Sequence, residues 1–137
     1  MKIQYLPHTA DIRMKIKGST LKELFVAGMI GMGNILKEGF CNKNTPIDSK
    51  SKIEIHALDR TCMLIDFLSE ILSHSYAEKS IYCKVEFQEF TSNKIKAILF
   101  GTHTNKLDEE IKAVTYHEAQ VHRNRNNQWE TLVVFDI

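Results

Sequence analysis

The stretch DIRMKIKGSTLKELFVAGMIGMGNIL, residues 11–36, changes its apolar spacing partway along. Up to Gly18, apolar and charged residues alternate, which is typical of a strand with one buried face. Beyond Gly18 the apolar residues recur at helical intervals, and Thr20 stands three positions before Glu23, the spacing of a capping box. The sequence therefore predicts a half-buried strand followed directly by an amphipathic helix over about 20–36.

The rest of the chain adds one helix and several strands. A second apolar stripe follows Asp59, a residue typical of helix caps, and predicts a helix over 60–76. From residue 80 onward the apolar spacing is close to two. Strands are predicted at 2–6, 52–58, 80–90, 93–103, 111–122 and 129–137, with breaks at Asn93, Gly101 and 123–128. The predicted class is α+β, with two amphipathic helices packed on one face of a mixed, largely antiparallel sheet.

Length and composition favour one globular domain over residues 1–137. Hydrophobic residues make up 43% and charged residues 26% of the chain, which excludes a disordered or fibrous protein. Eighteen Lys and Arg against seventeen Asp and Glu give a net charge of +1, so contacts with nucleic acid must be local. The opening MKIQYLPHTAD has neither a signal peptide nor a membrane span, and we expect a cytoplasmic protein.

Two sequence features that suggest chemistry have simpler explanations. The glycines of GMIGMG at 28–33 match neither the G-x-G-x-x-G motif of dinucleotide-binding proteins nor the P-loop motif, which has a Lys-Ser/Thr after its glycines. We therefore expect small residues that let a helix pack closely. Cys41, Cys62 and Cys83 form no C-x-x-C motif and predict neither a disulfide framework nor a zinc site, which fits a reducing compartment. Cys62 is expected to be a small buried residue.

The carboxylates carry more information, above all at the end of the sequence, VVFDI. Asp136 follows an apolar run and stands beside the terminal carboxylate of Ile137, while Asp11 lies between two apolar stretches. An ionised aspartate in an apolar strand must be paired, protonated or bound to a cation. If the chain ends meet, these oxygens suit Ca²⁺, Mg²⁺ or Mn²⁺. A solvated turn-forming aspartate is the alternative.

Two basic patches admit two interpretations. HRNRNN at 122–127 places two arginines in a predicted hairpin loop, and Lys94 and Lys96 lie on an exposed strand face. Such patches are usually solvated surface, and the alternative is a docking surface for RNA or an acidic partner.

Four segments resemble the archease family and occur in that family's order. They are HTADIRMKIKGSTLKELF near the start, LDRTCMLIDFLSEIL in the middle, IKAVTYH at 111–117 and the closing W...VVFDI. The resemblance implies a small α+β protein that is not itself an enzyme. Archeases activate the metal-dependent RNA-splicing ligase of tRNA splicing and RNA repair, promoting guanylylation of the ligase and its repeated turnover. The implied partner is this ligase, with RNA reached indirectly or through it and with no membrane contact.

The resemblance also implies site residues. In archeases a divalent cation, assigned as calcium, is held by residues that match Asp11, Asp136 and Ile137. Further motif positions are expected to face the partner: His8, Lys112 and His117. The sequence departs from the family at Pro7, where an acidic residue is common, and at Phe67, where tryptophan is usual.

Two other functions are compatible with the residues. One is a chaperone-like or adaptor module that binds protein or RNA without metal. The other is a hydrolase using Asp11 and Asp136 as acid and base, although the sequence offers no nucleophile beside them.

Overall fold

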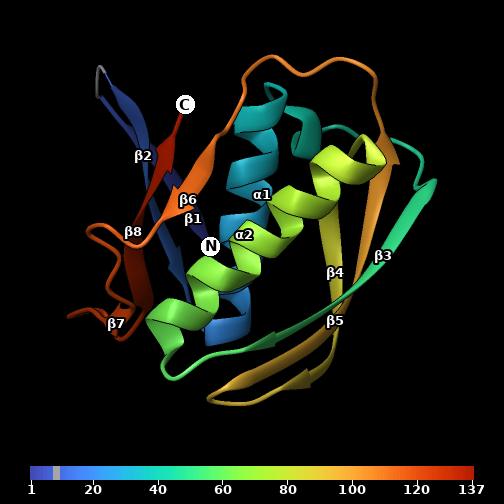
Figure 1. Ribbon diagram of the computed structural model, residues 1–137. Helices are drawn as coiled ribbons and strands as arrows, with labels where there is room; N and C mark the ends of the chain where they lie inside the picture. Colours follow the sequence, from blue (N-terminus) through green and yellow to red (C-terminus); the bar gives the residue numbers. More distant parts are fainter. Residues whose placement is uncertain (8–9) are drawn as a thin grey trace.

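The computed structural model describes residues 1–7 and 10–137 and contains two long helices, a short 3₁₀ turn and eight strands (Figure 1). The elements are β1 (Lys2–Leu6), β2 (Asp11–Gly18), α1 (Leu21–Leu36), η1 (Phe40–Asn42), β3 (Ser49–His56), α2 (Arg60–Glu78), β4 (Ser80–Phe90), β5 (Lys94–His103), β6 (Ala113–Thr115), β7 (His122–Arg123) and β8 (Trp129–Asp136). Within these described ranges, neither helix has the length and apolarity needed to span a bilayer.

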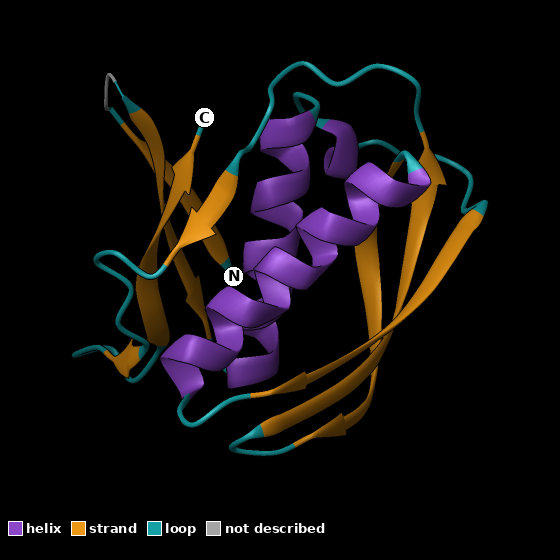
Figure 2. Cartoon of the chain, viewed as in Figure 1, coloured by secondary structure: helices purple, strands orange, loops and turns teal. Residues whose placement is uncertain are grey.

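The strands form two antiparallel sheets with the helices between them (Figures 1 and 2). One sheet has the order β1-β2-β8-β6, with β7 also paired to β8, and the other has the order β3-β5-β4. Helix α1 contacts β2 of the first sheet and β4 of the second, so one core joins both. The α+β class is confirmed, and the strands are divided between two sheets.

Both predicted helix caps are present. The Thr20 hydroxyl accepts a hydrogen bond from the Glu23 N–H at 3.1 Å, and Asp59 Oδ1 accepts one from the Cys62 N–H at 2.8 Å. Each cap satisfies a donor that the first turn of a helix leaves without an intrahelical partner. Residues that are poor helix formers therefore fix where each helix begins.

Replacing Asp59 by alanine is expected to lower the free energy of unfolding by about 1 kcal/mol, because the Cys62 N–H loses its acceptor. Urea unfolding measures the effect. Asp59→Asn keeps a capping oxygen and should lose much less. Equal losses in the two variants would show that the aspartate does not act as a cap.

The core is centred on an aromatic cluster. The ring centroids of Phe25 and Phe67 are 5.4 Å apart, and Phe25 lies edge-on to Phe90 at 5.1 Å. Phe67 also contacts Phe87, at 5.9 Å between ring centroids. Rings from both helices and from β4 thus form one cluster, which ties the helices to the three-stranded sheet.

Close packing explains the glycine-rich end of α1. Gly28, Gly31 and Gly33 are all buried, and a Cβ at Gly31 would collide with the Met14 side chain on β2. Gly31 thus lets the helix approach the five-stranded sheet, whereas Gly28 lies mainly against α2 and Gly33 lies against η1 and β4. The expectation of a packing role is confirmed.

Two strand predictions were wrong. Gly101 does not break a strand but lies within β5, where a Cβ would stand 2.5 Å from the Ile81 carbonyl oxygen of β4. The predicted strand 111–122 is reduced to β6 and β7, because a turn from Tyr116 to Ala119 interrupts it and Glu118 has a φ of 61°. Contacts with other elements, which local spacing does not show, decide both cases.

The cysteine prediction also needs correction. Cys41, in η1, and Cys83, in β4, form a disulfide, with their Cα atoms 5.3 Å apart. The two residues are far apart in the sequence, but η1 packs against β4. Cys62 is a free thiol and only half-buried. Cysteine usage therefore no longer argues for a reducing compartment.

Candidate functional site

The two aspartates singled out in the sequence are direct cross-strand neighbours. β2 and β8 pair in antiparallel register with Asp11 opposite Asp136. On the other side of β8, Ala113 of β6 lies opposite Asp136, and the Lys112 N–H donates to the Asp136 carbonyl at 2.7 Å. The end of β8 lies between β2 and β6 (Figure 1), so the backbone of Asp136 is held from both sides. Directly opposite residues have Cβ atoms about 5 Å apart.

Alternation along β2 and β8 explains why aspartates can stand at this position. Met14 and Ile16 of β2 face the core, and Val133 and Phe135 of β8 pack there as well. Asp136 is exposed, and Ile137 after it keeps 37% of its surface exposed. The carboxylate of Asp136 and the C-terminal carboxylate are therefore accessible to an ion or a partner.

A hollow of about 560 Å³ opens beside Asp11. Its lining includes Pro7 and two further acidic residues, Glu38 from the turn after α1 and Glu109 from the segment before β6. Asp108 lies close by, since its Oδ2 accepts a hydrogen bond from the Glu38 N–H at 2.9 Å. Acidic residues from other segments thus line the same hollow as Pro7, which contributes no carboxylate.

The donor set fits a hard cation. Asp11, Asp136 and the C-terminal carboxylate supply only oxygen ligands, which Ca²⁺, Mg²⁺ and Mn²⁺ prefer. Among the described residues no group of three or more His, Cys, Asp or Glu side chains is close enough to hold a metal. The two aspartate side chains alone therefore do not make up a complete metal site.

The residues expected to face a partner have different placements. Lys112 is exposed and adjoins Asp136 through its backbone hydrogen bond. His117 is also exposed, and its Nε2 lies 3.9 Å from Glu118 at the turn after β6. His8 lies outside the described residues.

Sequence reasoning missed a hydrogen-bonded pair at the far end of β6. The exposed Tyr116 hydroxyl donates to Asp66 of α2. The Asp66 carboxylate that accepts this hydrogen bond, together with burial, raises the pKa of Tyr116 to about 12. Tyr116 lines a hollow of about 620 Å³ with Asp59, Arg60 and Cys62 at the start of α2. Tyr116 belongs to the motif at 111–117, but nothing in its spacing indicates Asp66.

The predicted basic hairpin is present, but Arg123 lies in strand β7, paired with Trp129 of β8, and only Arg125 lies in the loop between the two strands. The Arg123 guanidinium carbon lies 4.7 Å from the Trp129 ring centroid, and that of Arg60 lies 5.1 Å from it. Arg123 also donates to Asn127. These cation–π contacts link α2 to the five-stranded sheet.

The outer face of the five-stranded sheet carries ion pairs. Arg13 pairs with Glu118, and Lys15 Nζ lies 3.3 Å from Glu130. Burial acts to raise the pKa of Glu130, but hydrogen bonds from Asn124 and Lys15 outweigh it and hold this pKa below its usual range. The charges along β2 are thus largely balanced.

This lowered pKa predicts a pH dependence. A carboxyl with a lower pKa in the folded state contributes stability above its unfolded pKa and loses it as the pH falls through the folded pKa. The melting temperature should therefore drop as the pH is lowered below the ordinary value of 4.5. Glu130→Gln should flatten this part of the profile. The exposed Glu86→Gln is the control, and an unchanged profile for Glu130→Gln would contradict the assignment.

Comparison with known proteins finds one family and several relatives that match nearly the whole chain. The model of the family described as "Archease protein family (MTH1598/TM1083)" matches residues 4–137. Protein archease of Methanosarcina acetivorans is 28% identical over 144 residues, covering 99% of this chain and 96% of the relative.

Two solved structures share the fold. The solution structure of Methanobacterium thermoautotrophicum protein 1598 has a TM-score of 0.77 at 21% identity, covering 98% of each chain. The crystal structure of a Thermotoga maritima protein described as an archease, "possible chaperone", has a TM-score of 0.65 at 22% identity, covering 100% of this chain and 98% of the other.

Proposed function

This chain belongs to the archease family, and we propose that it is a non-catalytic, divalent-metal-binding activator of the RNA-splicing ligase. In this role it promotes guanylylation of the ligase and repeated turnover in tRNA splicing and RNA repair. The proposal draws on the resemblance of the motifs at both ends of the chain to those of the family. The register that sets Asp11 opposite Asp136 is the observation that carries it.

The metal-holding residues of this proposal are Asp11, Asp136 and the carboxylate of Ile137, with Ca²⁺ preferred and Mg²⁺ or Mn²⁺ as alternatives. A bound divalent ion supplies positive charge that can neutralise a phosphate in the partner's nucleotide site. The chain's own part is to hold the carboxylates in place. The β2–β8 ladder aligns the two aspartates, and the Lys112 N–H fixes the backbone of Asp136.

The position of the site suits a partner-facing role. Asp136 and Ile137 are exposed at the end of β8, and Lys112 is exposed beside them. Exposed groups at the end of a strand are accessible to another protein. His117 and His8 complete the proposed contact as motif positions.

A reconstitution assay tests the function. The purified chain is added to an RNA-splicing ligase with GTP, and formation of the ligase–guanylate is followed with added metal and after chelation. We expect the chain to accelerate guanylylation and to raise the number of ligations per ligase molecule. An equal rate with and without the chain would refute the proposal.

The second candidate function is a chaperone-like or adaptor module that acts without metal. It is favoured by the fold shared with the Thermotoga maritima protein described as a "possible chaperone". A thermal melt with Ca²⁺ or Mn²⁺ separates the two functions, because a ligand that binds the native state must raise the melting temperature. A melting temperature that millimolar metal leaves unchanged would favour the adaptor.

A further inference from the structure

The three-stranded sheet carries an aromatic residue on its outward face. Phe100 lies on the central strand β5, and its neighbours Leu99 and Gly101 are buried toward the core. Directly opposite Phe100 are Lys50 on β3 and Lys84 on β4. Phe100 is half-buried and both lysines are exposed, so an aromatic ring stands between two cations on an open sheet face.

The two lysines are close to the ring itself. Lys50 Nζ lies 5.8 Å and Lys84 Nζ 5.6 Å from the Phe100 ring centroid. Lys52, two residues along β3 and on the same face as Lys50, adds a third positive charge. Lysine side chains are long and flexible, so their ammonium groups can leave the ring and reach a bound anion. We call Lys50, Lys52, Lys84 and Phe100 the Phe100 surface.

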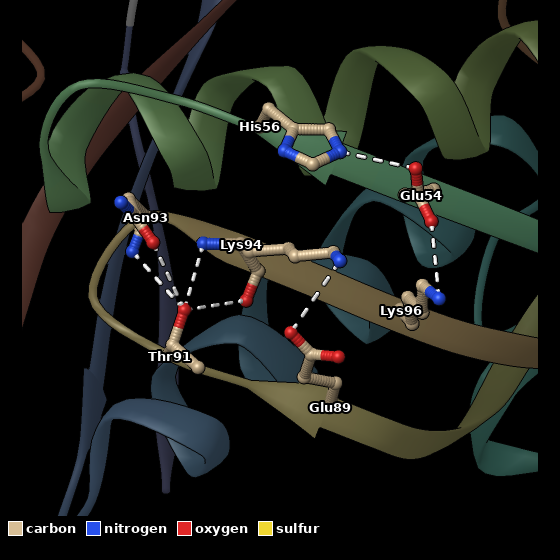
Figure 3. Close-up of polar contacts among 7 residues, drawn as sticks. All are labelled: Glu54, His56, Glu89, Thr91, Asn93, Lys94 and Lys96. Atoms are coloured by element: carbon tan, nitrogen blue, oxygen red, sulfur yellow. Dashed lines mark hydrogen bonds and ion pairs between the residues drawn. The ribbon is translucent and has the colours of Figure 1, made fainter.

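The other end of the same sheet face is neutralised, as Figure 3 shows. There Lys96 lies 3.6 Å from Glu54, and Lys94 lies 3.7 Å from Glu89. Across the described part of the chain, by contrast, no ion pair involves a lysine of the Phe100 surface. Glu86, opposite Ile98, adjoins the Phe100 surface, and Glu54, two residues along β3 from Lys52, is paired with Lys96. Positive charge is therefore concentrated around the ring.

We propose that the Phe100 surface binds single-stranded RNA, with a base stacked on Phe100 and the flanking phosphates on the lysines. An unpaired base offers a flat face to an aromatic side chain, whereas a base inside a duplex does not. Phosphates on either side of that base match cations on both sides of the ring. An acidic protein would use the lysines but would leave the ring without a role.

The choice of RNA rests on the proposed function, in which the partner ligase joins RNA ends. The Phe100 surface lies on the three-stranded sheet, whereas Asp11 and Asp136 lie on the five-stranded sheet. The two sites can thus engage different molecules, the aspartates the ligase and the Phe100 surface its RNA. The test of RNA binding uses the chain alone, without ligase or metal. Failure of RNA binding can therefore be told apart from failure of the proposed activation of the ligase.

Fluorescence anisotropy with a labelled oligouridine tests the proposal on the purified chain. Phe100→Ala should weaken binding at least about fivefold through loss of stacking. Lys50→Ala with Lys84→Ala should lower the slope of log affinity against log salt by about 1.4, since each phosphate contact in a single strand contributes about 0.7. Glu86→Lys should tighten binding, because it replaces the adjoining negative charge.

The neutralised half of the face supplies the control. Lys96→Ala removes a lysine charge from the same sheet face but outside the Phe100 surface, and it should leave RNA affinity unchanged. Circular dichroism checks that every variant is folded. Binding unaffected by Phe100→Ala, or lost equally with Lys96→Ala, would overturn the proposal. So would absence of binding at millimolar protein, or polyglutamate binding as tightly as the oligouridine.

Discussion

Replacing Asp136 by asparagine is expected to abolish both the metal-dependent rise in melting temperature and the stimulation of ligase guanylylation. Asp136 is exposed, so the change should leave the fold intact while removing one of the proposed anionic oxygen donors. Metal present at 100 times its dissociation constant stabilises a native protein by about 2.7 kcal/mol, and nearly all of that should be lost. Thermal melts with and without Ca²⁺, run beside the guanylylation assay, measure both effects.

Other substitutions separate coordination from general electrostatic attraction. Asp11→Asn should cause the same loss, because Asp11 stands opposite Asp136 in the ladder. Glu109→Gln removes an equal charge at the edge of the neighbouring hollow and should keep most of the metal response. A short polar extension after Ile137 should weaken metal binding by removing the carboxylate at that position. If Asp136→Asn keeps the full response, the site is elsewhere.

Replacing Phe67 by alanine is expected to destabilise the protein by about 3–5 kcal/mol, the usual cost of truncating a fully buried phenylalanine. Phe67 has no exposed surface, and its ring contacts both Phe25 on α1 and Phe87 on β4. The cavity would lie where the two helices meet the three-stranded sheet. Urea unfolding gives the free-energy change, which is a large share of the 5–15 kcal/mol typical of domains.

The control for this prediction is Phe100→Ala, which removes the same ring from the outer face of a sheet. It should cost much less stability, because Phe100 is only half-buried. Phe67→Leu should fall between the two. A loss below about 1 kcal/mol for Phe67→Ala would mean that the core collapses around the missing ring.

Local spacing predicted the elements of this fold where one face is buried along the whole segment. The change from alternation in β2 to helical spacing in α1, and the caps Thr20 and Asp59, were readable because each depends on nearby residues. Gly101 and the disulfide between Cys41 and Cys83 were not, because their roles depend on β4 lying beside β5 and η1. The division into two sheets depends on the same long-range pairing.

The candidate site was predictable in composition but not in geometry. Asp11 and Asp136 stood out as aspartates in apolar surroundings, yet only the strand register makes them neighbours. Register is also what sets Phe100 between Lys50 and Lys84. A shift of one residue in either ladder would turn these side chains to the opposite face, and a single sequence does not specify which register is adopted.

The pairing of β2 with β8 also has a consequence for the order of folding. It joins one end of the chain to the other in the middle of the five-stranded sheet, so it is among the least local contacts the molecule makes. Such contacts form slowly, because loop-closure entropy is lost before they add stability. During synthesis Met14 and Ile16 leave the ribosome long before Val133 and Phe135, which later pack with them in one core. A ribosome stalled before β8 would hold a chain with part of its core exposed, the form most prone to aggregate.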